Sequence, residues 1–96
     1  MEVREIIEEV KQVLKKYLPE GCRIYLFGSW AKGNAEEQSD VDIAILGGQE
    51  IDWMTFLKIK EEIENIPTLR KIDIVDLRVA GKRMRKEVIR YGIELK

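Results

Sequence analysis

Three aspartates in this chain have a spacing that suits a divalent cation. Asp40 and Asp42 lie one residue apart at the start of an apolar run over residues 41–46. In a β-strand this spacing directs both carboxylates to one face, about 6.5 to 7 Å apart. Asp73 lies within a second apolar run, and its carboxylate can join the pair if the two strands are neighbours about 4.8 Å apart. Three clustered carboxylates repel one another, so the cluster predicts a bound cation.

The residue types available restrict the choice of metal. The sequence has no histidine and a single cysteine, Cys22. This excludes a Cys/His zinc site, a Ser-His or Cys-His catalytic pair and an internal disulfide. Oxygen ligands completed by nucleotide phosphates favour Mg²⁺ or Mn²⁺. Two such ions about 4 Å apart would activate an attacking hydroxyl and stabilise a leaving pyrophosphate in an in-line displacement.

A candidate phosphate-binding turn precedes the first two aspartates. Gly28 and Ser29 follow the apolar run of residues 23–27. Glycine lets the backbone approach a phosphate closely, and the serine hydroxyl and exposed amides can donate to a triphosphate oxygen. Lys32 could pair with a phosphate, although a loop lysine is more often merely solvated. Each feature alone is a weak signal, and the argument rests on their combination.

Three strands and three helices are expected to position these residues. Apolar runs predict strands over residues 23–27, 41–46 and 71–77. Helical periodicity predicts helices at residues 3–17, at about 53–64 with Asp52 as N-cap, and through about Leu95. Between the first two strands, Trp30 to Gln38 should form a short turn or helical fragment leading into a loop. The order α-β-β-α-β-α predicts an α/β (α+β) fold with one mixed β-sheet packed by helices.

Several residues also have a purely structural interpretation. Asp76 is a second candidate for the third carboxylate, but alternation places it on the face opposite Asp73, where it could cap the following helix. Trp30, beside the candidate phosphate turn, is interpreted equally well as a lid over the site or as an exposed partner contact. Four side chains at helical spacing are predicted to be core, and Cys22 a small buried hydrophobic residue: the four are Trp53, Phe56, Met84 and Tyr91.

Composition predicts a small globular protein. With 45% hydrophobic and 36% charged residues in a chain of 96, one domain spanning residues 1–96 is expected, with no membrane span and no secretory signal, hence a cytoplasmic location. Seventeen basic residues nearly cancel eighteen acidic ones, so charge alone does not predict a nucleic-acid binder. Residues 78–90 form a local basic segment, interpreted either as a solvated helix surface or as an anion or partner site.

The combined pattern resembles a known enzyme family. Ten residues separate Gly28-Ser29 from Asp40-x-Asp42, and an in-strand Asp73 follows downstream. This resembles the polymerase-beta-like nucleotidyltransferase superfamily, and in its shortness the minimal nucleotidyltransferase branch, over residues 24–77. The resemblance implies that Gly28 and Ser29 bind the triphosphate of ATP. It further implies that Asp40, Asp42 and Asp73 hold the metal, with Asp73 as general base or as ligand of the ion that activates the acceptor hydroxyl.

One position departs from that family pattern. Many members have arginine where this chain has Lys32, so a two-pronged phosphate contact becomes a point charge. The departure concerns the role of Lys32 and leaves the aspartates unaffected.

The resemblance also implies a reaction and a partner. The leading hypothesis is Mg²⁺-dependent transfer of AMP, or another nucleotide, to a hydroxyl, with a tyrosine of a HEPN-family toxin as the acceptor and this chain as the antitoxin. A chain this short should depend on its acceptor to bring its own surface. One alternative is a catalytically inactive antitoxin that acts by binding alone. Another, held lower, is a transferase for small molecules, since such enzymes usually carry extra helices.

Overall fold

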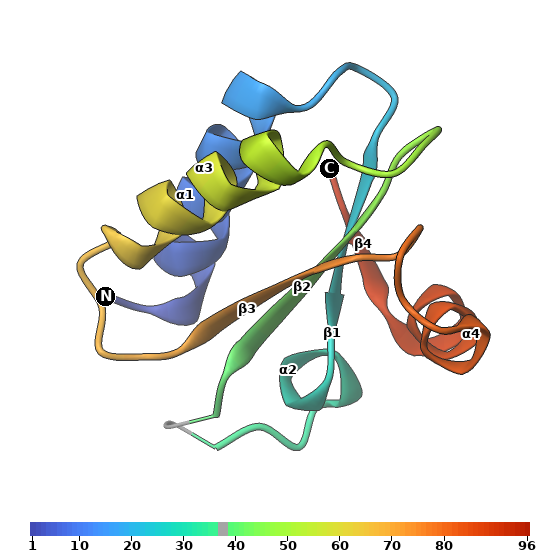
Figure 1. Cartoon of the computed structure of the whole chain (residues 1–96). Coiled ribbons are helices and arrows are strands. Elements are labelled where there is room, and N and C mark those ends of the chain that lie inside the picture. Colours follow the sequence, from blue (N-terminus) through green and yellow to red (C-terminus); the bar gives the residue numbers. More distant parts are fainter. Residues whose placement is uncertain (37–38) are drawn as a thin grey trace.

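Four strands form one mixed sheet in the computed structural model, which describes residues 1–36 and 39–96. The strand order is β3-β2-β1-β4, with β2 parallel to β3 and the other neighbours antiparallel. Figure 1 shows the sheet crossing the molecule between its helices. The predicted single mixed sheet is confirmed. The strands are β1 (Arg23–Phe27), β2 (Val41–Leu46), β3 (Ile72–Asp76) and β4 (Ile93–Leu95).

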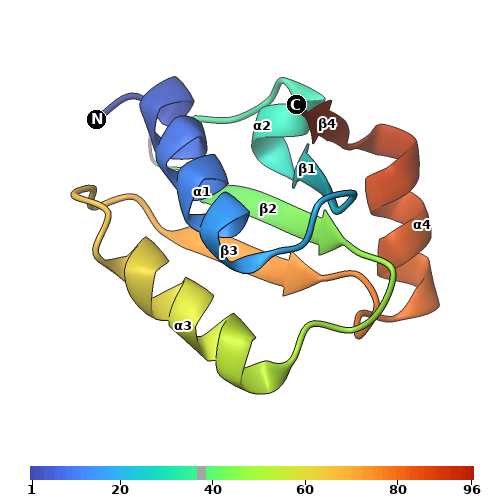
Figure 2. The same cartoon turned by 90° about the horizontal axis from the view of Figure 1, so that it is seen from above.

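Two long helices cover one face of the sheet, α1 (Val3–Tyr17) and α3 (Trp53–Glu64). Figures 1 and 2 show them side by side on the face opposite α2 (Ser29–Lys32) and α4 (Lys82–Tyr91). The main core lies beneath α1 and α3, where alternate residues of β2 have no exposed surface. Those residues are Val41, Ile43 and Ile45. Alternation therefore sends the residues between them to the opposite face.

The helix boundaries follow from local hydrogen bonds. Glu2 and Glu5 form a reciprocal capping box at the start of α1. Asp52 caps α3 as predicted, because its carboxylate accepts a hydrogen bond of 3.3 Å from the amide of Thr55. The predicted segment from Trp30 contains the short helix α2, and its predicted end at Gln38 lies outside the described residues.

The end of the chain corrects the predicted element order. The final helix stops at Tyr91, and residues 93–95 form β4 instead of continuing the helix to Leu95. A Cβ at Gly92 would lie 2.5 Å from the carbonyl oxygen of Val88 and 3.2 Å from that of Leu26. Glycine thus lets the chain pass close to β1, and β4 pairs with that strand. The three-residue alternation is too short to predict a strand, so the order α-β-β-α-β-α lacked this element.

Three side chains predicted to be core are exposed. Trp53 is 69% exposed, Tyr91 56% and Met84 41%. Phe56 and Cys22 are half-buried, so the prediction of burial holds for them in part. Helical spacing identified a face, but a four-stranded sheet has too little area to cover every apolar residue on it. None of the helices in the described ranges has the length and apolar character needed to cross a membrane.

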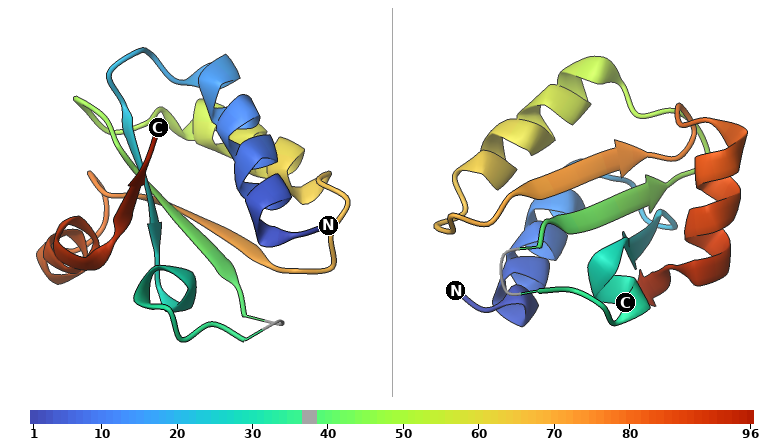
Figure 3. Two further views of the ribbon diagram at one scale, coloured as in Figure 1. Left: turned by 180° about the vertical axis from the view of Figure 1, so that it is seen from behind. Right: turned by 90° about the horizontal axis from the view of Figure 1, so that it is seen from below.

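The face of β2 and β3 that points away from α1 and α3 is covered at one end, where Ala44 is buried with Val88 of α4, and is open where the two strands begin. The right panel of Figure 3 shows both strands from below, with α4 beside one end of the two strands. The short helix α2 lies beside β1, the other neighbour of β2. On this face, the side chains that alternate with the main core of β2 and β3 begin with Asp42 and Asp73. Polar groups can therefore meet a ligand there without displacing core residues.

Candidate active site

A row of three residues crosses the sheet on its open face. Phe27 at the end of β1 is the register partner of Asp42, and Asp42 is the partner of Asp73 on β3. Register partners in neighbouring strands point to the same side. The structure therefore brings Asp42 and Asp73 together, as the sequence predicted, and places Gly28 directly after the first residue of the row.

Partial burial and the contact with Asp73 raise the pKa of Asp42. Burial raises the pKa of Asp42 to about 6, and the charges of Asp73 and Asp40 and a hydrogen bond with Asp73 add to the rise. Lys71 offsets part of the effect, since its ammonium lies 3.7 Å from a carboxylate oxygen of Asp73. Two carboxylates held in contact disfavour their joint ionisation. A cation between them would remove that penalty.

Asp40 lies just outside the pair. It directly precedes β2 and is exposed, although its charge is close enough to raise the pKa of Asp42. Within residues 1–36 and 39–96, no three acidic or cysteine side chains are gathered as a ready-made metal site. The structure thus brings Asp42 and Asp73 together as a pair and leaves Asp40 outside it.

Gly28 is shaped to lie against Asp42. Its φ of 74° and ψ of −149° fall in a region that is essentially restricted to glycine. A Cβ at this position would lie 2.3 Å from the Oδ2 atom of Asp42. The backbone therefore passes over the carboxylate with no room for a side chain. Ser29 follows as the half-buried first residue of α2.

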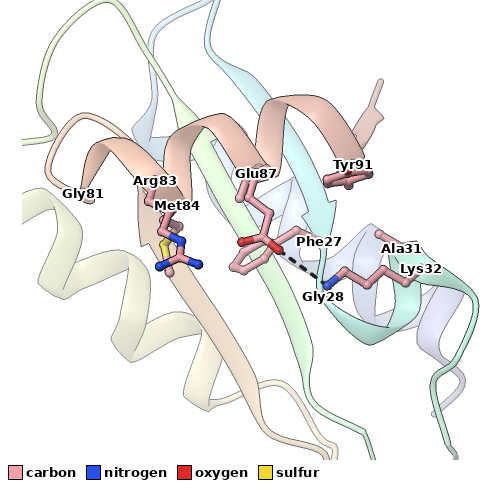
Figure 4. A pocket seen from close by; sticks show the side chains of 11 residues that line it. Phe27, Gly28, Ala31, Lys32, Gly81, Arg83, Met84, Glu87 and Tyr91 are labelled. Atoms are coloured by element: carbon pink, nitrogen blue, oxygen red, sulfur yellow. Dashed lines mark ion pairs between the residues drawn. The ribbon is translucent and has the colours of Figure 1, made fainter.

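A largely apolar cavity of about 500 Å³ adjoins this turn, between α2 and α4. Gly28 and Lys32 line it from one side, and Glu87 and Tyr91 line it from α4. Figure 4 shows Lys32 and Glu87 reaching toward each other across the opening, with 3.6 Å between the ammonium and a carboxylate oxygen. Both side chains are more than half exposed, so the ion pair is weak and Lys32 can readily replace Glu87 with another anion. Sequence reasoning placed Lys32 near the site and missed its partner.

Trp30 supports the loop that leads to Asp40. Its indole nitrogen donates to the carbonyl of Ser39 at 3.3 Å, and the guanidinium of Arg70 donates to the same carbonyl at 3.3 Å. Arg70 also lies over the indole ring, 5.3 Å from its centroid. Trp30 is half-buried against the main core. It is therefore neither a lid nor an exposed partner contact, and it fixes the residue next to Asp40.

Asp76 has a structural role that differs from the suggested helix cap. It is 7% exposed, on the face opposite Asp73, and its carboxylate accepts hydrogen bonds from the amides of Ile51 (2.8 Å) and Arg78 (3.0 Å). The first of these bonds ties the segment before α3 to the end of β3. The choice of Asp73 over Asp76 as the residue beside Asp42 is confirmed.

Replacing Asp76 should therefore lower the stability of the folded protein. Asp76→Ala leaves two amides near the end of β3 without their acceptor, and we expect the free energy of unfolding to fall by about 2–4 kcal/mol. For a chain of this size, that lowers Tm by more than about 10 °C in a thermal melt. Asp52→Ala, which removes an exposed helix cap, should cost only about 1 kcal/mol. Equal losses in the two variants would contradict this assignment.

Comparisons with known proteins identify the family of this chain. The model of the family described as polymerase beta, nucleotidyltransferase, matches residues 8–96. A candidate protein adenylyltransferase of Methanocaldococcus jannaschii is 37% identical, over 99% of this chain and 100% of that protein.

Two solved structures share the fold. One is a toxin-antitoxin complex with AMP-PNP, with a TM-score of 0.77, 28% identity, and coverage of 93% of this chain and 71% of the other. The second is a tri-AMPylated HEPN toxin of Shewanella oneidensis with an MNT antitoxin. Its TM-score is 0.73, its identity 25%, and the match covers 97% of this chain and 71% of the other.

Proposed function

The chain belongs to the polymerase beta nucleotidyltransferase family, and from that premise we propose that it transfers AMP from ATP to a hydroxyl group on a partner protein. The observation that carries the proposal is the contact between Asp42 and Asp73, in one row with the turn at Gly28. A carboxylate pair beside a backbone that can approach phosphates suits a metal-bound nucleotide better than any other ligand class.

The residues present fit Mg²⁺. Asp42 and Asp73 supply hard oxygen ligands whose repulsion a cation would relieve, and Asp40 can turn toward them from the start of β2. When bound, Mg²⁺ neutralises phosphate charge and lowers the pKa of an acceptor hydroxyl, and two ions are expected, with Mn²⁺ as a possible substitute. These three aspartates are the proposed ligands.

The donor nucleotide would extend from the glycine turn into the neighbouring cavity. The amides around Gly28 and the hydroxyl of Ser29 would donate to the triphosphate. The apolar cavity between α2 and α4 has room for the nucleoside. Lys32, once it exchanges Glu87 for a phosphate oxygen, would contribute one positive charge to the triphosphate.

The transfer itself is a displacement at the α-phosphorus. The acceptor hydroxyl oxygen forms a bond to the α-phosphorus, and the bond to the bridging oxygen of the β-phosphate breaks, releasing pyrophosphate. Asp73 lies nearest the outer edge of the sheet and would accept or orient the hydroxyl proton. The AMP moiety ends on the acceptor as a phosphodiester.

The acceptor is proposed to be a HEPN-family protein with a modifiable tyrosine. The related structure of an AMPylated HEPN toxin bound to an MNT antitoxin supports this choice. Transfer of AMP to the toxin would make this chain an antitoxin that acts by covalent modification.

A labelling experiment separates this proposal from its alternatives. The purified chain, Mg²⁺ and the protein encoded beside its gene are incubated with ATP labelled at the α- or the γ-phosphate. We expect the partner to gain the α-label and not the γ-label, and Asp42→Asn to abolish the signal. A stable complex without α-label would contradict transfer and indicate an antitoxin that acts by binding alone. Label on a small molecule would contradict the protein acceptor.

A further inference from the structure

We propose that the acceptor protein docks in an apolar groove along the outer edge of β3, next to Asp73. The inference rests on the proposed function and adds to it the surface that selects the acceptor. The groove has a volume of about 840 Å³ and lies between the first turns of α3, the second half of β3 and the loop that leads into α4. The groove shares Gly81 and Met84 with the cavity beside the glycine turn, but Gly28 does not line it.

Large apolar side chains surround the groove and remain in contact with solvent. Trp53 is 69% exposed, Val79 63% and Leu57 41%. Small proteins rarely expose such side chains together unless another molecule covers them. Tryptophan in particular dominates the affinity of many protein interfaces. The groove is thus suited to an apolar cluster on a partner.

The geometry of the reaction indicates which partner that is. In an in-line displacement, the attacking hydroxyl and the leaving pyrophosphate lie on opposite sides of the phosphorus. The glycine turn follows β1, Asp42 lies on β2 and Asp73 on the edge strand β3. With the triphosphate at the β1 end of this row, the acceptor must approach from the β3 end.

The groove lies next to Asp73 along β3. Ile74 and Val75, the two residues after Asp73 on β3, contribute to its wall. At about 3.3 Å per residue, Val75 in the wall of the groove lies within about 7 Å of Asp73 along the strand. A protein seated in it can present a hydroxyl to Asp73 while Gly28 and Lys32, on the far side of the neighbouring cavity, stay outside the groove.

The test compares variants that change the groove and leave the nucleotide site intact. Trp53→Ala and Leu57→Ser alter exposed side chains that do not line the cavity between α2 and α4. Leu69→Ala, at a fully exposed leucine on the loop before β3, is the matched control. The affinity for the protein encoded beside the gene is measured by calorimetry, together with the affinity for AMP-PNP and Mg²⁺ and the rate of α-label transfer.

We expect each groove variant to weaken partner binding at least tenfold, with nucleotide affinity unchanged. Transfer should fall by a similar factor at low partner concentration and recover at saturating partner. Partner affinity within twofold of wild type for Trp53→Ala would overturn the inference, as would a wild-type dimer that this substitution dissociates while partner binding stays intact. Absence of label with the wild-type chain would count against the proposed function, whereas the binding measurement still decides the groove.

Discussion

Asp42→Asn should abolish AMP transfer and, at the same time, stabilise the metal-free protein. The substitution removes a proposed metal ligand, and a loss of about 4 kcal/mol of transition-state stabilisation corresponds to about a thousandfold lower rate. The stabilising effect arises because the pKa of Asp42 is raised to about 6 in the folded chain, above its ordinary value of 3.8. Ionised Asp42 therefore destabilises the fold at neutral pH, and a neutral asparagine does not.

The raised pKa of Asp42 determines how the stability of the folded chain changes with pH. Below about pH 4, Asp42 is protonated in both the folded and the unfolded chain. The folded chain binds this proton more tightly, so the contribution of protonation to the free energy of unfolding is fully present there. That contribution is lost as the pH rises through about 6. A shift of two units corresponds to about 3 kcal/mol, which solvent screening of this half-exposed group reduces to about 1 kcal/mol.

Chemical unfolding at two pH values measures the effect. We expect Asp42→Asn to raise the free energy of unfolding by about 1 kcal/mol at pH 7.5 in EDTA, and to change it little at pH 4. Added Mg²⁺ and AMP-PNP should stabilise the wild type and not the variant. A variant that is less stable than wild type at pH 7.5 without metal would contradict the repulsion between Asp42 and Asp73.

Gly28→Ala should reduce transfer at least a hundredfold and destabilise the fold. The new Cβ would lie 2.3 Å from Oδ2 of Asp42, so the carboxylate or the turn must move. A displacement of about 1 Å at a reacting centre can lower the rate by about a hundredfold. The backbone conformation adds a strain of about 1–3 kcal/mol for any residue with a Cβ.

A matched glycine separates strain from the clash. Gly21 also has a positive φ, of 92°, but a Cβ there would meet no atom within 4 Å. Gly21→Ala should lower the free energy of unfolding by about 1 kcal/mol and leave transfer unchanged. In addition, Gly28→Ala should cost less stability in an Asp42→Ala background, where the clash is absent. Additive losses in that double-mutant cycle would show that the turn does not rest on the carboxylate.

The carboxylate pair was predictable because two simple rules placed it. Alternation along a strand fixed the face of Asp42 and of Asp73, and adjacency of the two strands brought them together. The glycine turn was predicted from its position after a strand, as a place where backbone could approach a phosphate, and the structure adds its close approach to the carboxylate of Asp42. Alternation and the position of Gly28 depend on local spacing, which a single sequence contains, whereas the adjacency of β2 and β3 was a condition of the argument that the structure supplies.

The remaining features depend on contacts between distant residues. The pairing of Lys32 with Glu87 joins residues 55 apart, and the hydrogen bond from Arg70 to Ser39 joins residues 31 apart. Strand β4 exists because Gly92 brings the chain against β1, which three residues of alternation cannot reveal. The exposure of Trp53 likewise follows from the limited area of the sheet and not from the periodicity of its helix.

A crystal structure with AMP-PNP and Mn²⁺ tests the central claim most directly, because anomalous scattering locates the ion. We expect a Mn²⁺ peak bound by Asp42 and Asp73, with Asp40 turned inward to the same site and the triphosphate lying along Gly28 and Ser29. A nucleotide bound with no ion between Asp42 and Asp73, or with its phosphates remote from Gly28, would contradict the account.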